Sequence, residues 1–172
     1  MPDDAKPPKR GDFARAALML GLGVALAGCA AFGPSGLPVG TSLTDARRAL
    51  FGQTGEYPLP GGGTRLEFAR GRETYMLDFD RAGTLVASQQ VLTESNLASI
   101  APGTSRADLR LRFGRPAWIY GVRYREPQQV WNYRFEGADC VWYQVSISDA
   151  TQQVTETGLG PDPACEAPND RQ

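Results

Sequence analysis

Past its middle, the chain contains the stretch Gly103-Thr104-Ser105-Arg106-Ala107-Asp108-Leu109-Arg110-Leu111-Arg112-Phe113-Gly114-Arg115-Pro116. An earlier stretch nearly repeats this sequence. That stretch is Gly40-Thr41-Ser42-Leu43-Thr44-Asp45-Ala46-Arg47-Arg48-Ala49-Leu50-Phe51-Gly52. Both contain Gly-Thr-Ser-x-x-Asp-x-Arg and close on Phe-Gly, with one extra residue before the Phe in the first copy. The copies start 63 residues apart, a longer period than that of common solenoids, and there are only two. The repeat therefore predicts two small tandem units.

Each copy has the features of one complete short helix. Ser42 and Ser105 are predicted N-caps, and the Asp three residues later can return a hydrogen bond to the N–H of the cap. The same carboxylates favour the positive end of the helix dipole. Gly52 and Gly114 supply a left-handed residue at the helix end, and Pro116 prevents a restart.

The rest of each unit has the alternating apolar pattern of strands. Strands are predicted over residues 65–68, 74–79 and 84–92 of the first unit, followed by a short helix capped by Thr93. The second unit repeats this plan over residues 130–135, 141–147 and 152–158. The predicted fold class is α+β: two tandem units, each with short helices packed on a small antiparallel sheet.

An export signal precedes these units. A basic start leads into residues 16–27, which carry no charge and are too few to span a bilayer of about 30 Å. The alternative, a buried helix of the domain, fits the basic flank and the following Gly/Pro linker less well. Leu26-Ala27-Gly28-Cys29 resembles the lipobox of bacterial lipoproteins, in which the Cys is acylated. That resemblance, with Ala30 rather than Asp after the Cys, implies an outer-membrane lipoprotein that faces the periplasm.

These features divide the chain into five segments. They are a lipoprotein signal peptide (1–28), a lipidated linker (29–39), a first helix-plus-sheet unit (40–92), a second unit with a disulfide-tied tail (93–165) and a C-terminal tail (166–172).

Cysteine usage agrees with export. With Cys29 assigned to lipidation, Cys140 and Cys165 remain as a pair in an oxidising compartment. A disulfide between them would contribute roughly 3 kcal/mol on the chain-entropy estimate. A redox or zinc site is the alternative, but the chain has no Cys-x-x-Cys and no His. We therefore expect a structural disulfide.

Composition points away from catalysis and from nucleic acid. The 144 residues from Cys29 onward contain fourteen Arg, no Lys and sixteen acidic residues, which is a formal charge of −2 without the basic excess that nucleic-acid binding requires. The absence of His excludes Ser-His-Asp and Cys-His catalysis. Asp78 and Asp80 could form a carboxylate pair, but a turn at Asp80 with Asp78 facing water is the simpler interpretation. We expect no enzyme, no metal and no cofactor.

The second unit concentrates Trp, Tyr and Arg, the residue types that dominate protein interfaces. The predicted partner-binding residues are Trp118, Tyr120, Arg123, Arg125 and Trp142. Trp142 alternates with the apolar residues of its strand, so it should point away from the helices. The alternatives are that the aromatics fill a small core, that the tail tied by Cys165 covers Trp142, and that the arginines are solvated or contact anionic lipid headgroups.

The pattern Gly-Thr-Ser-x-x-Asp-Leu-x-x-x-Phe-Gly-Arg-Pro at residues 103–116, followed by the aromatic strand at 131–133, resembles the SmpA/OmlA (BamE-like) lipoprotein family. The first unit matches it less well, because Gly52-Gln53-Thr54 lacks the Gly-x-Pro ending. The resemblance implies short helices on a small antiparallel sheet and an accessory role in outer-membrane β-barrel assembly, with envelope proteins as partners and the membrane reached through acylated Cys29. Two such units in tandem are similar to β-lactamase inhibitor proteins, so an inhibitor or stabiliser of another envelope protein is the alternative.

Overall fold

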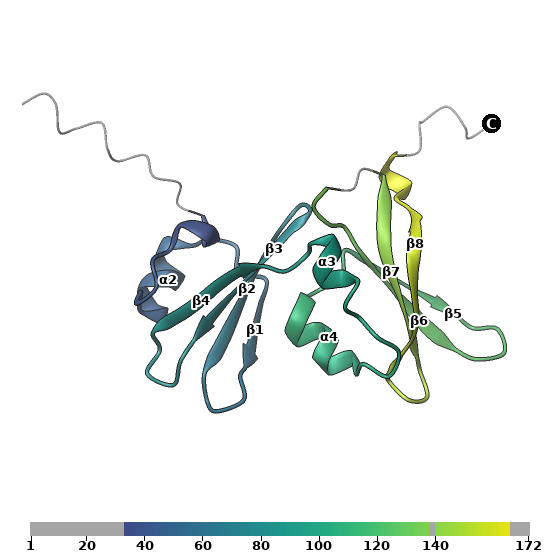
Figure 1. Cartoon of the computed structure of the whole chain (residues 1–172), viewed down its shortest axis with the longest axis horizontal. Helices are drawn as coiled ribbons and strands as arrows, with labels where there is room; N and C mark the ends of the chain where they lie inside the picture. The colour runs from purple at the N-terminus through teal and green to yellow at the C-terminus, as the bar shows by residue number, and fades with distance from the viewer. Residues whose placement is uncertain (1–32, 138–139, 166–172) are drawn as a thin grey trace, which may run out of the picture. The chain divides into compact units, whose positions relative to one another are not determined.

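The computed structural model describes residues 33–137 and 140–165. In this part of the chain, eight strands form two four-stranded antiparallel sheets in which each strand pairs with the next along the chain (Figure 1). The strands are Gly55–Pro58 (β1), Thr64–Arg70 (β2), Glu73–Phe79 (β3), Leu85–Gln90 (β4), Trp118–Val122 (β5), Gln128–Tyr133 (β6), Val141–Ser148 (β7) and Val154–Pro161 (β8). The helices are Pro34–Gly36 (η1, 3₁₀), Leu43–Ala49 (α2), Glu94–Leu97 (α3), Arg106–Phe113 (α4) and Pro163–Cys165 (η2, 3₁₀).

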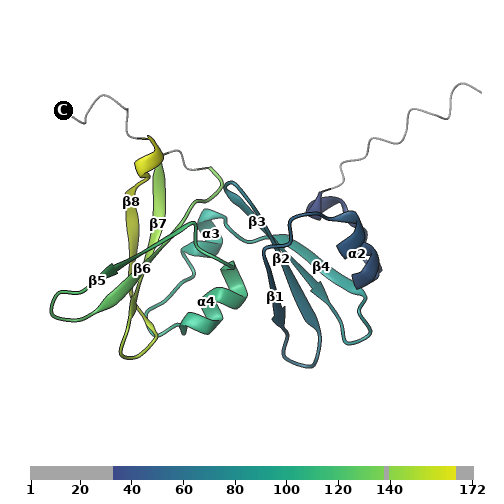
Figure 2. The same ribbon diagram turned by 180° about the vertical axis from the view of Figure 1, so that it is seen from behind.

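The predicted α+β class is wrong, because the fold is dominated by its sheets. Of the described residues, 42% lie in strands and only 19% in helices. One strand in each sheet, β1 and β5, was not predicted from the sequence, and both are edge strands (Figure 2). An edge strand that is exposed along most of its length lacks the apolar alternation by which strands are recognised, and β5 is such a strand.

The repeated Gly-Thr-Ser does more than begin a helix, because it also joins each helix to the fourth strand of its sheet. Gly40 N–H donates to the carbonyl of Leu85, and Leu85 N–H donates to that of Thr41, at 2.8 Å each. Gly103 and Thr104 make the same pair of bonds with Val154 in the second unit, at 2.8 and 2.9 Å. Register shifts at equivalent places, in β3 after Asp78 and in β7 after Ser146, also match. The duplication inferred from the sequence therefore extends to the hydrogen bonding.

The predicted N-caps are confirmed, with one correction to their geometry. The hydroxyl oxygens of Ser42 and Ser105 accept the backbone N–H of Asp45 and Asp108, at 3.1 and 3.0 Å. Each carboxylate accepts the cap hydroxyl at 2.7 Å, whereas the prediction had it accept the N–H of the cap residue. Thr93 caps α3 as expected.

The end of the first helix differs from the prediction. The helix ends at Ala49, so Gly52 lies beyond its C-cap, Leu50. Leu50 is eight residues after Ser42, as Phe113 is after Ser105, and both are buried. Phe51 is 88% exposed. Leu50 therefore occupies the place that the Phe-Gly alignment assigned to Phe51.

The apolar side chains form two clusters. One joins Ala46 and Leu50 to β2 and β3 residues such as Leu66 and Phe79. The other joins Leu109 and Phe113 of α4 to the second sheet (Figure 1). Its members are Met76, Val91, Leu92, Leu97, Ile100, Leu109, Phe113, Trp131, Tyr133, Phe135, Val145, Ile147 and Val154. Because Met76 belongs to β3, the second cluster extends to the reverse side of the first sheet.

The predicted signal peptide, its Cys29 and the tail 166–172 lie outside the described residues. Among residues 33–137 and 140–165, none of the helices combines the length and the apolar character needed to cross a membrane.

Candidate partner-binding face

The two faces of the second sheet have different surroundings. Trp131, Tyr133, Val145 and Ile147 point toward α4 and are buried. Side chains at the alternating positions point the other way, as the strand register requires. We call this second surface the open face; its residues are Trp118, Tyr120, Val122, Gln128, Val130, Asn132, Gln144, Ser146, Glu156 and Gly158.

A polar network supports the centre of the open face. Asn132 is fully buried, and its amide nitrogen donates to the carbonyls of Trp118 and Val130 at 3.3 and 3.2 Å. Its amide oxygen accepts the side-chain N–H of Gln144 at 2.8 Å. Because a buried amide is costly unless it is hydrogen-bonded, this arrangement fixes Asn132 and Gln144 in one orientation.

Trp118 and Tyr120 stand at the rim of this face on edge strand β5. Their side chains are 58% and 41% exposed, which is unusual for large aromatics of a sheet. A hollow of about 350 Å³ lies beside Tyr120 and is lined largely by polar side chains, among them Ser146 and Glu156. The structure thus brings together two of the predicted partner-binding residues.

Arg123 and Arg125 lie in the turn between β5 and β6 and are exposed. Arg125 has a φ of 59°, and its guanidinium lies 5.3 Å from the ring centre of Tyr124. The two arginines therefore lie next to the edge strand in sequence and outside the polar network. Their predicted partner contact stays a prediction.

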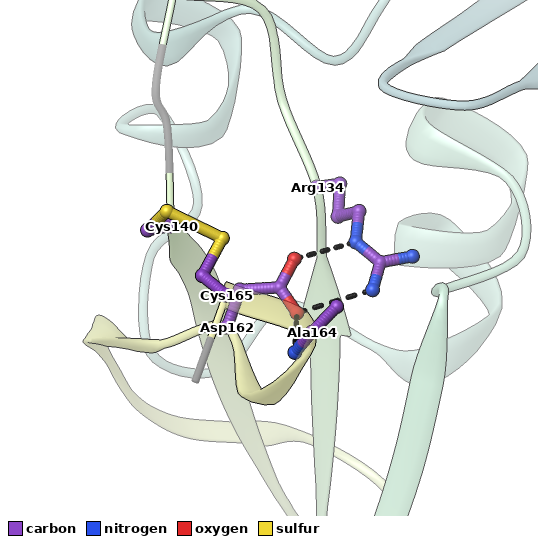
Figure 3. Close-up of a disulfide and its surroundings, with 5 residues drawn as sticks. All are labelled: Arg134, Cys140, Asp162, Ala164 and Cys165. Atoms are coloured by element: carbon purple, nitrogen blue, oxygen red, sulfur yellow. Dashed lines mark hydrogen bonds and ion pairs between the residues drawn. A yellow bond between two sulfur atoms is a disulfide. The ribbon is translucent and has the colours of Figure 1, made fainter. Parts of the chain in front are cut away.

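Trp142 lies on the side that strand parity predicted, but it is only 6% exposed. The Arg134 guanidinium lies over its ring, 5.3 Å from the ring centre. Arg134 in turn donates to both carboxylate oxygens of Asp162, at 2.6 and 3.1 Å (Figure 3). Arg134 and Asp162, which lies in the segment tied by Cys165, therefore cover Trp142, as the alternative interpretation had it. Trp142 is not part of the open face.

The predicted disulfide is present and holds this end of the sheet. Cys140 and Cys165 are joined with their Cα atoms 5.3 Å apart, across 25 residues (Figure 3). Asp162 N–H donates to the carbonyl of Cys140 at 2.9 Å. The bridge and the Arg134–Asp162 pair therefore hold the same short segment against β7.

The electrostatics of Asp162 follow from these contacts. The Arg134 guanidinium holds the pKa of the Asp162 carboxyl well below its usual range, and burial opposes this effect only in part. The Ala164 N–H, 3.0 Å from the carboxylate, lowers the pKa further. The buried Trp142 indole nitrogen also lowers the pKa of Asp162, although it has no hydrogen-bond partner among the described residues. Asp162 is therefore ionised at neutral pH.

The first sheet has an equivalent face, and that face makes contacts with α4 and the residues that follow it. Strand register pairs Glu67 with Gly55 and Met76, as it pairs Asn132 with Trp118 and Gln144. Glu67 is fully buried and accepts the N–H of Arg115 at 3.2 Å. Arg65, on the same face, donates to the carbonyl of Leu111 at the end of α4, at 2.7 Å.

The equivalence includes the tyrosines of the two edge strands. Tyr57 in β1 corresponds to Tyr120 in β5, two residues along from the Gly55 and Trp118 positions. Tyr57 is half-buried and donates a hydrogen bond to Glu67. The pKa of Tyr57 is raised to about 12, mainly because the phenol is buried and secondly because it donates this hydrogen bond to Glu67. Tyr120 has an exposed ring at the same place, so the second sheet repeats a face whose first copy is already occupied.

Asp78 and Asp80 do not form a paired carboxylate site. Asp78 makes a two-point ion pair with Arg65, at 2.5 and 2.7 Å, and 21% of its side chain is exposed, so the expectation that it faces water holds only in part. Asp80 accepts the N–H of Thr84 at 2.9 Å, as the predicted turn requires. The long-range partner of Asp78 could not be inferred from local pattern.

Comparisons with known proteins give this chain no family. No family model matches the sequence, and no curated protein matches it either. Among solved structures, a cysteine-rich secretory protein of Staphylococcus aureus aligns with 72% of this chain and 44% of its own, at 11% identity and a TM-score of 0.28. The match spans less than half the length of that protein, and its TM-score is too low to support an argument about fold or function.

Proposed function

We propose that the protein is a lipid-anchored, non-enzymatic binding protein of the bacterial envelope that holds a partner protein on the open face of its second sheet. Accessory work in outer-membrane β-barrel assembly is the role that best fits the lipobox and the family resemblance of residues 103–116. Acylation of Cys29 would keep the protein at the periplasmic side of the outer membrane.

One observation carries the proposal: the open face, whose aromatic rim is exposed, is the duplicate of a face that the first sheet uses for contact. Glu67 and Arg65 engage the Arg115 N–H and the end of α4, whereas Trp118 and Tyr120, on the corresponding face of the second sheet, have no described segment over them. Exposed Trp and Tyr beside a prearranged polar network are typical of interface hot spots. The second sheet therefore has the composition and the geometry of a free interface.

The same observation bears on the alternative role, an inhibitor or stabiliser that would use both sheets as one gripping surface. The equivalent face of the first sheet already contacts α4 through Arg65 and Glu67. This favours binding through the second sheet alone. The identity of the captured protein separates the two roles, since a barrel-assembly component supports the first and another envelope protein the second.

The test uses the full-length lipoprotein, solubilised from its native envelope in mild detergent. A photo-crosslinking amino acid in place of Tyr120 should capture a partner, and the same residue in place of Phe51 should not, although Phe51 is even more exposed. Trp118→Ala with Tyr120→Ala should weaken capture by roughly thirty-fold, the effect of losing about 2 kcal/mol from an aromatic anchor.

Folding must be separated from binding in this test. Because both aromatics are exposed, the double variant should keep the thermal midpoint of the parent. Phe51→Ala is the matched control and should leave capture unchanged. Undiminished capture by a folded Trp118→Ala, Tyr120→Ala variant would show that the partner binds elsewhere.

A further inference from the structure

A second hollow lies on the opposite side of β5 from the open face. It encloses about 720 Å³, a size typical of sites for small organic ligands. Ile119 belongs to its wall, whereas its neighbours Trp118 and Tyr120 belong to the open face. The wall is built from the start of α4, the segment that leads into β5, and the turn before β8; it comprises Ser105, Arg106, Ala107, Arg110, Arg115, Pro116, Ile119, Trp131, Thr151, Gln152 and Gln153.

The hollow has an apolar floor. Trp131 lies there almost completely buried, and Ile119 and Pro116 line the side. The indole N–H of Trp131 is bonded to Gln129 at 3.3 Å, so the ring presents no unsatisfied donor to the hollow. The surface open to a hydrocarbon body is therefore the apolar side formed by Ile119, which is 44% exposed, and Pro116.

Three arginines surround this floor, and none of its described wall residues is acidic. The guanidiniums of Arg106 and Arg110 lie 5.6 and 5.9 Å from the ring centre of Trp131. Arg106 also donates to Gln152 at 2.8 Å. Stacking uses the flat face of a guanidinium and leaves N–H groups at its edge free to bind an anion.

Arg115 is the third arginine that lines the hollow. Within the described part of the chain, none of these three side chains forms an ion pair with a carboxylate, although Arg47, Arg48, Arg65 and Arg134 do. Three positive charges at a hollow whose described wall has no acidic residue attract a negative group there.

We propose that this hollow is a binding site for a small amphiphilic carboxylate. The apolar body of the ligand lies against Ile119 and Pro116, beside the two arginines that cover Trp131. Its carboxylate accepts hydrogen bonds from Arg115 and Arg110, with Arg106 contributing charge. The site is separate from the open face, and it does not depend on the partner-binding role proposed above.

The test measures the heat of binding of three probes to the full chain in detergent micelles, with micelles alone as the blank. 1-Naphthoate carries both the apolar body and the charge, 1-naphthalenemethanol carries the body without the charge, and acetate carries the charge without the body. We expect saturable one-site binding of 1-naphthoate, and at least tenfold weaker binding of the other two. Loss of a hydrogen bond to a charged group has an effect of that size.

Two variants test the placement. Arg115→Gln should weaken 1-naphthoate binding about tenfold with an unchanged thermal midpoint, because this side chain is exposed and unpaired among the described residues. Arg123→Gln, which removes an exposed charge outside the hollow, should have no effect. Equal binding of 1-naphthoate and 1-naphthalenemethanol, equal losses in the two variants, or the absence of saturable binding would each overturn the proposal.

Discussion

Replacement of Asp162 by Asn should uncouple the tail from Trp142. The carboxylate of Asp162 is largely buried, with 8% of its side chain exposed, and it meets Arg134 at two points. Asp162→Asn keeps the shape of the side chain and removes its charge. The Arg134 guanidinium, which is 35% exposed, would then lie over Trp142 without its counterion.

The expected loss lies between that of a surface ion pair and that of a buried one, because Arg134 still reaches water. Hydrogen bonds to charged groups contribute roughly 1.5–3 kcal/mol, so we expect Asp162→Asn to lower the free energy of unfolding by about 2 kcal/mol at pH 7. For a chain of this size, that corresponds to a thermal midpoint lower by about 6 °C.

The effect should depend on pH with a definite sign. The pKa of Asp162 is lowered in the folded protein, so its contribution is present above the unfolded pKa of about 4 and is lost as pH falls below it. The difference in midpoint between Asp162→Asn and the parent should therefore narrow from pH 5 toward pH 2.5.

Thermal scans across this range, followed by Trp fluorescence, check the prediction. Glu56→Gln is the matched control, because Glu56 also pairs with an arginine, Arg47, but both side chains are 45% exposed. Its effect should be below about 1 kcal/mol. A difference between Asp162→Asn and the parent that stays constant over this pH range would refute the assignment of the low pKa to the Arg134 pair.

Three further substitutions test the packing at Gly114, the disulfide and the lipid anchor. Gly114→Ala should cost about 3 kcal/mol of stability in chemical unfolding, because φ is 73° there and the new Cβ would lie 2.7 Å from the buried carboxyl carbon of Glu67; an unchanged midpoint would contradict the packing. Replacement of both Cys140 and Cys165 by Ser should cost about 3.5 kcal/mol, the chain-entropy estimate for a separation of 25 residues, and thiol labelling of the unfolded parent should find neither of the two cysteines free. Cys29→Ser should move the protein out of the outer-membrane fraction or leave its signal peptide uncleaved; a processed variant that still sediments with that fraction would contradict the lipoprotein assignment.

Local features of the sequence predicted local structure well. Ser42, Ser105 and Thr93 cap helices because the cap contact spans only three residues, and strand parity placed Trp142 on the correct side. The exposure of Trp142 was not predictable in this way. Its cover depends on Arg134 and Asp162, which are 28 positions apart in sequence. Strand β5, which supplies Trp118 and Tyr120, was not predicted because buried and exposed side chains do not alternate along it.

The divergence of the two units explains why one sheet face is closed and the other open. At one register position the first sheet has Glu67, whose carboxylate binds Tyr57 and the Arg115 N–H, and the second has Asn132, whose amide bonds stay within its own sheet. The closed face needs Gly55, because a Cβ there would lie 2.7 Å from Glu67, whereas the second sheet has the large and exposed Trp118 at that place. A carboxylate buried at this position of the second sheet would have no described donor equivalent to the Arg115 backbone N–H. The Asn132 amide, whose hydrogen bonds stay within its own sheet, avoids the cost of a buried and unpaired charge. The duplicated face is thus stable without a neighbour, and this allows its aromatic rim to remain exposed.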